Sequence, residues 1–214
     1  MTDVNTLVKE IKQSFRQLMD GATAQSMRNK GLNYSLNWGV TLPRLREMAD
    51  KIADGKDPAL LYDLSIALWK ENVRECKILA TMLMPAEKML PEVADIWMEQ
   101  TPTLEIAEQA AFNLYQHLPY AADKAYQWLA SPDDLPQICG YHVLGRLFSQ
   151  GQEPNERGIN EFIDQAISAL QGPSLSLRKA ALNALNRFAT LGLLYERLAQ
   201  SALRKGGFNP ISSK

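Results

Sequence analysis

A succession of short amphipathic helices over residues 37–84 constrains this chain more than any other feature. A polar residue followed by a proline or a leucine-proline pair begins each of the first two helices, at Thr41 and at Asp57. In both of these helices, and in a third that starts near Asn72, apolar residues recur at helical spacing along one side. Because each helix has a single apolar face, it needs neighbouring helices to cover that face.

The same pattern continues through the rest of the chain, with further starts predicted at Thr101, Ser131 and Ser174. No segment alternates as a strand would, and no glycine-rich phosphate loop is present. Helix pairs recur about every 30–40 residues, as in HEAT-like repeats. The sequence therefore predicts an all-α, right-handed solenoid of about five helix pairs, with a compact helical bundle as the alternative. We expect one domain over residues 1–214, with an N-terminal helical segment over 1–31, helix pairs over 32–206 and a frayed tail over 207–214.

The composition indicates an ordinary globular protein of the cytoplasm. No apolar run is long enough to cross a membrane, and the N-terminus does not resemble a signal peptide. The two cysteines, Cys76 and Cys139, are expected to be buried free thiols in a reducing compartment. His117 and His142 have no second ligand at metal-binding spacing, so neither a metal nor another cofactor is predicted.

Charge is distributed unevenly along the chain although its net value is only −1. The net charge is +3 over residues 1–56, −8 over 57–136 and +4 over 137–214. A solenoid can bring its two basic ends onto one face that contacts the phosphates of DNA, whereas ordinary solvated helix faces are the alternative interpretation. The residues predicted to contact the DNA backbone are Arg28, Lys30, Arg44, Arg46, Arg178, Lys179 and Arg187.

A set of residues over 32–84 carries a family resemblance. Its members are Trp38-Gly39-Val40, Pro43, Leu45-Arg46, Trp69 and Glu75-x-Lys77-x-Leu79-Ala80. This set is similar to the N-terminal signature of the bacterial DNA alkylation repair family, the AlkD-like alkylpurine DNA glycosylases. The resemblance implies a fold of HEAT-like repeats and a double-stranded DNA partner. Trp38 itself is interpreted either as a core residue packed between repeats or as part of a basic and aromatic DNA-binding surface.

The resemblance also implies where catalysis would occur. In the family, a Trp and an Asp one helical turn apart act on a cationic alkylated purine, and the carboxylate stabilises the oxocarbenium-like transition state. The matching positions here are Leu104 and Glu108, so a carboxylate is retained and the aromatic residue is not. On a later helix, Asn183 and Asn186 stand where the family has a Trp and an Arg. A structural alternative for Glu108 and its neighbour Glu105 is that acidic residues favour the first turn of a helix.

Three functions therefore remain open from the sequence. The first is a divergent DNA-binding protein of this family, independent of base sequence, with weak or no glycosylase activity. The second is a catalytically inert scaffold that binds a protein or peptide, which the acidic middle of the chain favours. The third is an active alkylpurine glycosylase that uses Glu108.

Overall fold

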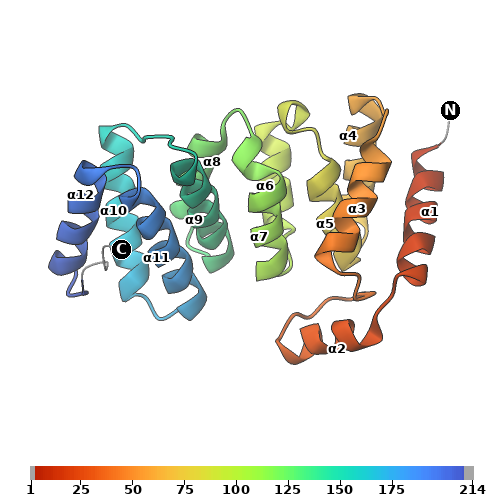
Figure 1. Cartoon of the computed structure of the whole chain (residues 1–214), viewed down its shortest axis with the longest axis horizontal. Helices are drawn as coiled ribbons and strands as arrows, with labels where there is room; N and C mark the ends of the chain where they lie inside the picture. The colour runs from red at the N-terminus through yellow and green to blue at the C-terminus, as the bar shows by residue number, and fades with distance from the viewer. Residues whose placement is uncertain (1–2, 210–214) are drawn as a thin grey trace. The chain divides into compact units, whose positions relative to one another are not determined.

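The structure, a computed structural model, describes residues 3–209 and contains helices throughout this range (Figure 1). Its α-helices are α1 (Val4–Gln17), α2 (Gly21–Asn29), α3 (Leu42–Ala53), α4 (Pro58–Lys70), α5 (Arg74–Leu83), α6 (Pro91–Glu99), α7 (Leu104–Asn113), α8 (Ala121–Leu129), α9 (Asp134–Ser149), α10 (Glu156–Gln171), α11 (Leu175–Ala189) and α12 (Leu193–Lys205). Two short 3-10 helices are η1 (Ala86–Lys88) and η2 (Tyr115–His117). Within residues 3–209 the extended pairing is a single bridge between Leu36 and Val73. The prediction of an all-α fold is confirmed.

The helices divide into two compact units, one through Pro119 and one from Tyr120 onward. The first unit holds α1–α7 and the second holds α8–α12. The boundary follows Pro119, a residue type that disfavours a continuous helix. Most of the predicted tail over 207–214 lies outside the described residues.

The first unit is built around α5. This helix packs against α3, α4 and α7, and all of its residues except Met82 are buried. Next to it, the rings of Trp69 and Trp97 are stacked with their centroids 4.1 Å apart and their planes within 2° of parallel. Because α5 is surrounded on all sides, even its polar residues must find partners inside the protein.

The second unit is built around α9, which packs against α8 and α11. Its aromatic core joins four rings from different helices, with Phe162 lying 5.0 Å from Phe148 and 5.2 Å from Phe188. Tyr195 of α12 packs edge-on against Phe188 at 5.1 Å. Close contact between α8 and α9 requires a glycine at Gly140, where a Cβ would lie 2.8 Å from a carbonyl oxygen of α8.

The helix start predicted at Thr101 is wrong because this residue is used elsewhere. The hydroxyl of Thr101 donates a hydrogen bond to the carbonyl of Trp97 at 2.8 Å, so Thr101 completes the end of α6. Thr103 caps α7 instead, and accepts a hydrogen bond from the amide of Ile106. Asp20 caps α2 through the amides of Ala22 and Thr23, so that Gly21 begins this helix.

The helix start predicted at Ser131 is also wrong, and Pro136 supplies the reason. A helix capped by Ser131 would place Pro136 in its interior, where the missing N–H removes a helical hydrogen bond. The helix α9 starts at Asp134 instead, so that Pro136 falls in the first turn, where helical N–H groups have no intrahelical partner. Ser131 accepts a hydrogen bond from the amide of Asp133 and belongs to the preceding turn.

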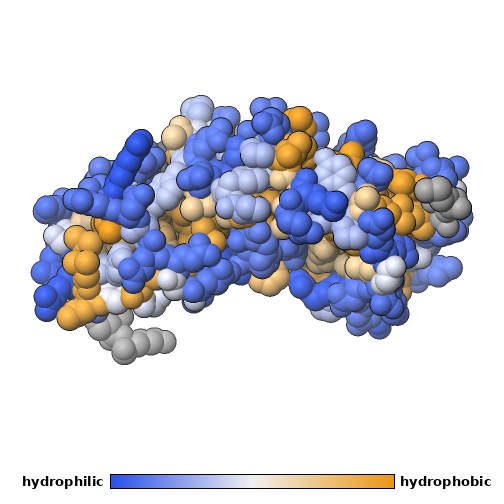
Figure 2. All heavy atoms as spheres, turned by 90° about the horizontal axis from the view of Figure 1, so that it is seen from above, coloured by the Kyte–Doolittle hydropathy of each residue, from blue (hydrophilic) through white to orange (hydrophobic). Residues whose placement is uncertain are grey.

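The face of the molecule shown in Figure 2 is mostly hydrophilic. Figure 2 shows one face, on which apolar residues appear in separate groups among polar ones. Large apolar side chains with the greatest exposure include Met19, Leu90, Leu175, Leu193 and Leu194. Across the described part of the chain, no helix combines the length and the apolar character that crossing a membrane would require.

Candidate functional site

A buried ion pair joins α5 to α7 in the first unit. The guanidinium of Arg74 donates to both carboxylate oxygens of Glu105, at 2.6 and 2.9 Å. It also donates to the carbonyl of Val40 at 2.9 Å and lies 3.2 Å from the carboxylate of Glu75. The Arg74 side chain is only 1% exposed. The bidentate pair with Glu105 and the further contacts to Val40 and Glu75 explain why an arginine of α5 can lie in the core.

Glu75 fixes the position of the connector between α2 and α3 (residues 30–41) through hydrogen bonds to its backbone. Its carboxylate accepts hydrogen bonds from the backbone amides of Trp38 and Val40, each at 3.2 Å. Between them, Gly39 has φ +73°, and a Cβ at this position would lie 2.1 Å from the carbonyl oxygen of Asp20. A glycine is therefore required at position 39 by a tight backbone contact.

Tyr34 anchors the same connector to α7. Its hydroxyl donates to Glu105 and lies 2.8 Å from the hydroxyl of Thr103. Burial raises the pKa of Tyr34, and the hydrogen bond to Glu105 raises it further. For Glu105, burial alone would raise the pKa, but the hydrogen bonds and charge of Arg74 outweigh burial and lower it. Glu105 thus does more than favour the first turn of its helix, since it neutralises Arg74.

Lys77 and Trp69, two further residues of the family resemblance, contact each other inside the first unit. Lys77 donates to the carbonyl of Trp69 at 2.9 Å, and its ammonium lies 4.4 Å from the ring centroid of the same tryptophan. Burial lowers the pKa of Lys77. Cys76 is buried, and burial raises the pKa of its thiol to about 12, which leaves it an unreactive thiol. Within residues 3–209, no three His, Cys, Asp or Glu side chains gather as a metal site would require.

Trp38 is half-buried, and the guanidinium of Arg16 lies 5.6 Å from its ring centroid. Its indole N–H is buried and makes no hydrogen bond to the described residues. The side chain therefore packs in the first unit and carries a cation on its ring. A role of Trp38 in DNA binding stays a prediction.

The outward face of α7 carries the predicted catalytic position. Glu108 is exposed and Leu104, one turn earlier, is partly buried. Phe112, one turn after Glu108 and therefore on the same face, is 36% exposed. The guanidinium of Arg46 lies 5.4 Å from the Phe112 ring centroid and donates to Asn113 at 3.3 Å. Phe112 is not among the site residues predicted from the sequence, although its spacing of four residues from Glu108 indicates a shared face.

All four basic residues predicted to bind DNA in the first unit are exposed: Arg28, Lys30, Arg44 and Arg46. Two of them have polar partners within their own helix. Arg28 donates to Gln25, at 2.8 and 3.3 Å. Arg44 forms an exposed ion pair with Glu47 at 2.8 Å. These contacts are weak enough for a phosphate to replace them.

In the second unit, the predicted residues all belong to α11. Arg178, Lys179, Asn183 and Arg187 are exposed, and Asn186 is half-buried. The helix carries three basic residues and no carboxylate. Its outward side therefore offers positive charge and two amide side chains, a combination suited to phosphate oxygens.

Comparison with known proteins agrees with this description. A family model described as "DNA alkylation repair enzyme" matches residues 11–186. A solved structure described as "a new family of proteins related to the HEAT-like repeat DNA glycosylases with affinity for branched DNA structures" is similar to 96% of this chain, over 86% of its own, with a TM-score of 0.80 and 17% identity. No curated protein matches. The structural similarity shows the HEAT-like fold, and the match of the family model over most of the sequence shows that this chain belongs to the DNA alkylation repair enzyme family.

Proposed function

We propose that this protein binds DNA through the sugar–phosphate backbone, without reading base sequence, and excises alkylated purines weakly or not at all. The observation that carries this proposal is the composition of α11, with three basic residues, two asparagines and no carboxylate. Positive side chains that face solvent bind phosphates and release counterions, and this contribution to affinity does not depend on sequence. Among the helices of residues 3–209, none matches a motif that would read base edges in a groove.

The argument against efficient excision rests on α7 and α11. Leu104 cannot provide the aromatic face that the family resemblance implies beside the carboxylate, and Asn183 and Asn186 replace a further aromatic residue and a cation. Losing one preorganised electrostatic contact costs about 10²–10³ in rate. Contacts that act together are not additive, but the loss of several leaves little catalysis.

A single-turnover assay on duplex DNA methylated at N3 or N7 of purines tests this part of the proposal. We expect base release far below that of an active family member assayed beside it. Robust release that is lost in Glu108→Ala would instead support the alternative of an active glycosylase. The observation that favours this alternative is that Glu108 shares the outward face of α7 with Phe112, over which Arg46 lies. Robust release that persists in Glu108→Ala would show that another residue is catalytic.

Binding is tested with labelled duplex and four-way-junction DNA, because affinity for branched DNA is ascribed to the family of the similar structure. We expect both probes to bind, with no dependence on base sequence, and the affinity to fall steeply with added salt. Binding should be unaffected by EDTA, since no cofactor is proposed. Absence of binding to either probe at low salt would refute the DNA proposal and leave the protein-binding scaffold, which the net charge of −8 over residues 57–136 favours.

A further inference from the structure

Arg46 of α3 is held in place by a second helix although its side chain is exposed. Its guanidinium lies 5.4 Å from the ring centroid of Phe112 and donates to the amide oxygen of Asn113 at 3.3 Å, and both partners belong to α7. Arg28 and Arg44, by contrast, have their partners within their own helices. Contacts with a ring and an amide on a neighbouring helix therefore fix the orientation of the Arg46 guanidinium in the first unit.

The orientation of the Asn113 amide is in turn set from the core of the first unit. Its nitrogen donates to the hydroxyl of Thr81 on α5 at 3.0 Å. Thr81 is buried, and its hydroxyl donates to the carbonyl of Ile78 at 2.7 Å. Because a hydroxyl has one proton, that of Thr81 can only accept from Asn113, so the amide nitrogen must face Thr81 and the amide oxygen must face Arg46. A chain of hydrogen bonds thus runs from the interior to the exposed guanidinium.

This support leaves Arg46 with its full positive charge. The ring and the amide that hold it are both uncharged, and Glu47, the next residue in the chain, is paired with Arg44 at 2.8 Å. A guanidinium has further N–H groups beyond the one bonded to Asn113, and their planar fork matches the oxygens of a phosphate. Ordering a flexible side chain at an interface costs free energy, and an arginine that is already held bears less of this cost.

We propose that Arg46 is a preorganised anchor for one phosphodiester of bound DNA, and that Asn113 and Phe112 are positioning residues that act through it. This inference rests on the proposed DNA-binding function and deepens it. A contact between Arg46 and the DNA backbone is expected from the sequence, whereas neither Asn113 nor Phe112 is among the site residues predicted there. Their contribution to affinity passes through the guanidinium of Arg46.

Arg46→Met, Asn113→Ala and the double variant test the anchor. The measurement is fluorescence anisotropy of labelled duplex and four-way-junction DNA over a range of salt concentrations. Arg46→Met should bind about 10-fold more weakly, and its slope of log affinity against log salt should fall by about 0.9, the value for one phosphate. Asn113→Ala should bind about 2- to 10-fold more weakly with an unchanged slope, because the charge remains but must be ordered on binding. The double variant should bind like Arg46→Met.

Phe112→Leu and Phe112→Tyr form a matched pair that tests the ring. Leucine removes the aromatic face and tyrosine keeps it. We expect Phe112→Leu to bind about 2- to 10-fold more weakly with an unchanged salt slope, and Phe112→Tyr to bind like the wild type. Wild-type affinity in Phe112→Leu would overturn the positioning role of this ring.

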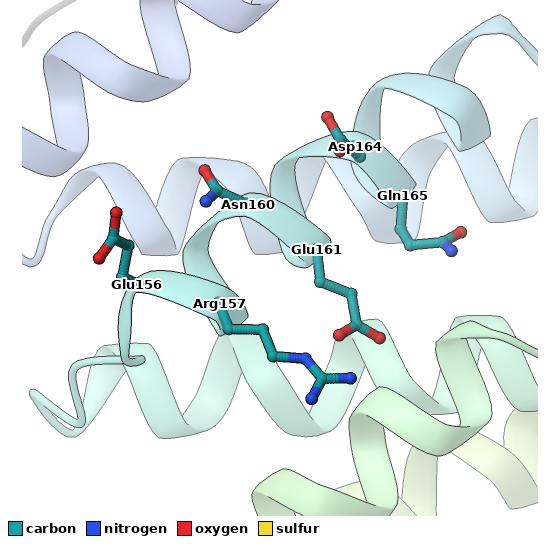
Figure 3. A pocket seen from close by; sticks show the side chains of 6 residues that line it. All are labelled: Glu156, Arg157, Asn160, Glu161, Asp164 and Gln165. Carbon is teal, nitrogen blue, oxygen red and sulfur yellow. The ribbon is translucent and has the colours of Figure 1, made fainter.

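Arg157→Met on α10 is the control for the loss of one positive charge. Arg157 lines a hollow in the second unit together with Glu156, Glu161 and Asp164 (Figure 3). Those carboxylates make its surroundings unsuitable for phosphate, so this variant should keep the affinity and the salt slope of the wild type.

Two results would overturn the anchor while leaving DNA binding intact. One is a wild-type affinity in Arg46→Met. The other is a double variant that binds more weakly than Arg46→Met, since Asn113 would then act by another route. Urea denaturation of each variant separates these results from a folding defect, and if Asn113→Ala does not fold, Phe112→Leu tests the same support. If the wild type itself binds neither probe, the proposed function fails and the anchor fails with it.

Discussion

Arg74 shows how much a single buried charge matters in this protein. Its side chain is 1% exposed, and its removal would leave Glu75 and Glu105 in the core without their counter-charge. We expect Arg74→Met to lower the free energy of unfolding by about 3–5 kcal/mol, measured by urea denaturation. As a control, Arg44→Met removes an ion pair with Glu47 in which both side chains are more than half exposed, and should cost about 1 kcal/mol or less. Similar losses in the two variants would contradict the structural role of Arg74.

Glu105 should make stability depend on pH in the acid range. Its pKa in the folded protein is lowered by Arg74 despite burial, whereas in the unfolded chain it is the ordinary value of about 4.3. The stabilisation is therefore present above about 4.3 and is lost as the pH falls through the lower folded-state pKa. We expect Glu105→Gln to flatten the fall of the unfolding free energy in this window, measured by urea denaturation at a series of acid pH values. An unchanged acid slope would show that other carboxylates are responsible.

At the scale of elements, the connector between α2 and α3 depends on the backbone of Gly39. We expect Gly39→Ala to destabilise the protein by more than Gly31→Ala, as measured by thermal and urea denaturation. Both glycines have positive φ, +73° and +82°, and an alanine in this region costs about 1–2 kcal/mol. Only at Gly39 would the added Cβ also meet backbone atoms, because the space around Gly31 is open. Equal costs at the two positions would mean that the contact with Asp20 does not hold the connector.

Helix boundaries illustrate which local signals can be read from the sequence. Asp57 caps α4 through the amide of Ala59, as predicted. Thr41 stands at the start of α3 but makes no side-chain cap. Thr101 is bonded to the end of the preceding helix, and Pro136 moves the start of α9 to Asp134. Local patterns thus predicted that helices would form, and competing hydrogen bonds set some of their ends.

At the scale of the whole molecule, we expect residues 1–214 to unfold as a single domain. The family model runs continuously from residue 11 to residue 186, across the boundary between the two units. In repeat proteins of this size, interfaces between neighbouring repeats couple their stabilities. A single calorimetric transition, with the van't Hoff enthalpy equal to the calorimetric enthalpy, is the expected outcome. Two separate transitions would show that the units before and after Pro119 fold independently.

The sequence by itself determined the helical class and the family, because apolar periodicity, capping residues and the motif over residues 32–84 are local properties of the chain. It also identified the basic character of α11. Only the tertiary structure decided that Glu105 neutralises Arg74 and that Arg46 lies over the ring of Phe112. These pairs join residues from different helices. Their proximity depends on which faces of the helices pack together, and the spacing of residues along one helix carries no information about the helix that lies opposite.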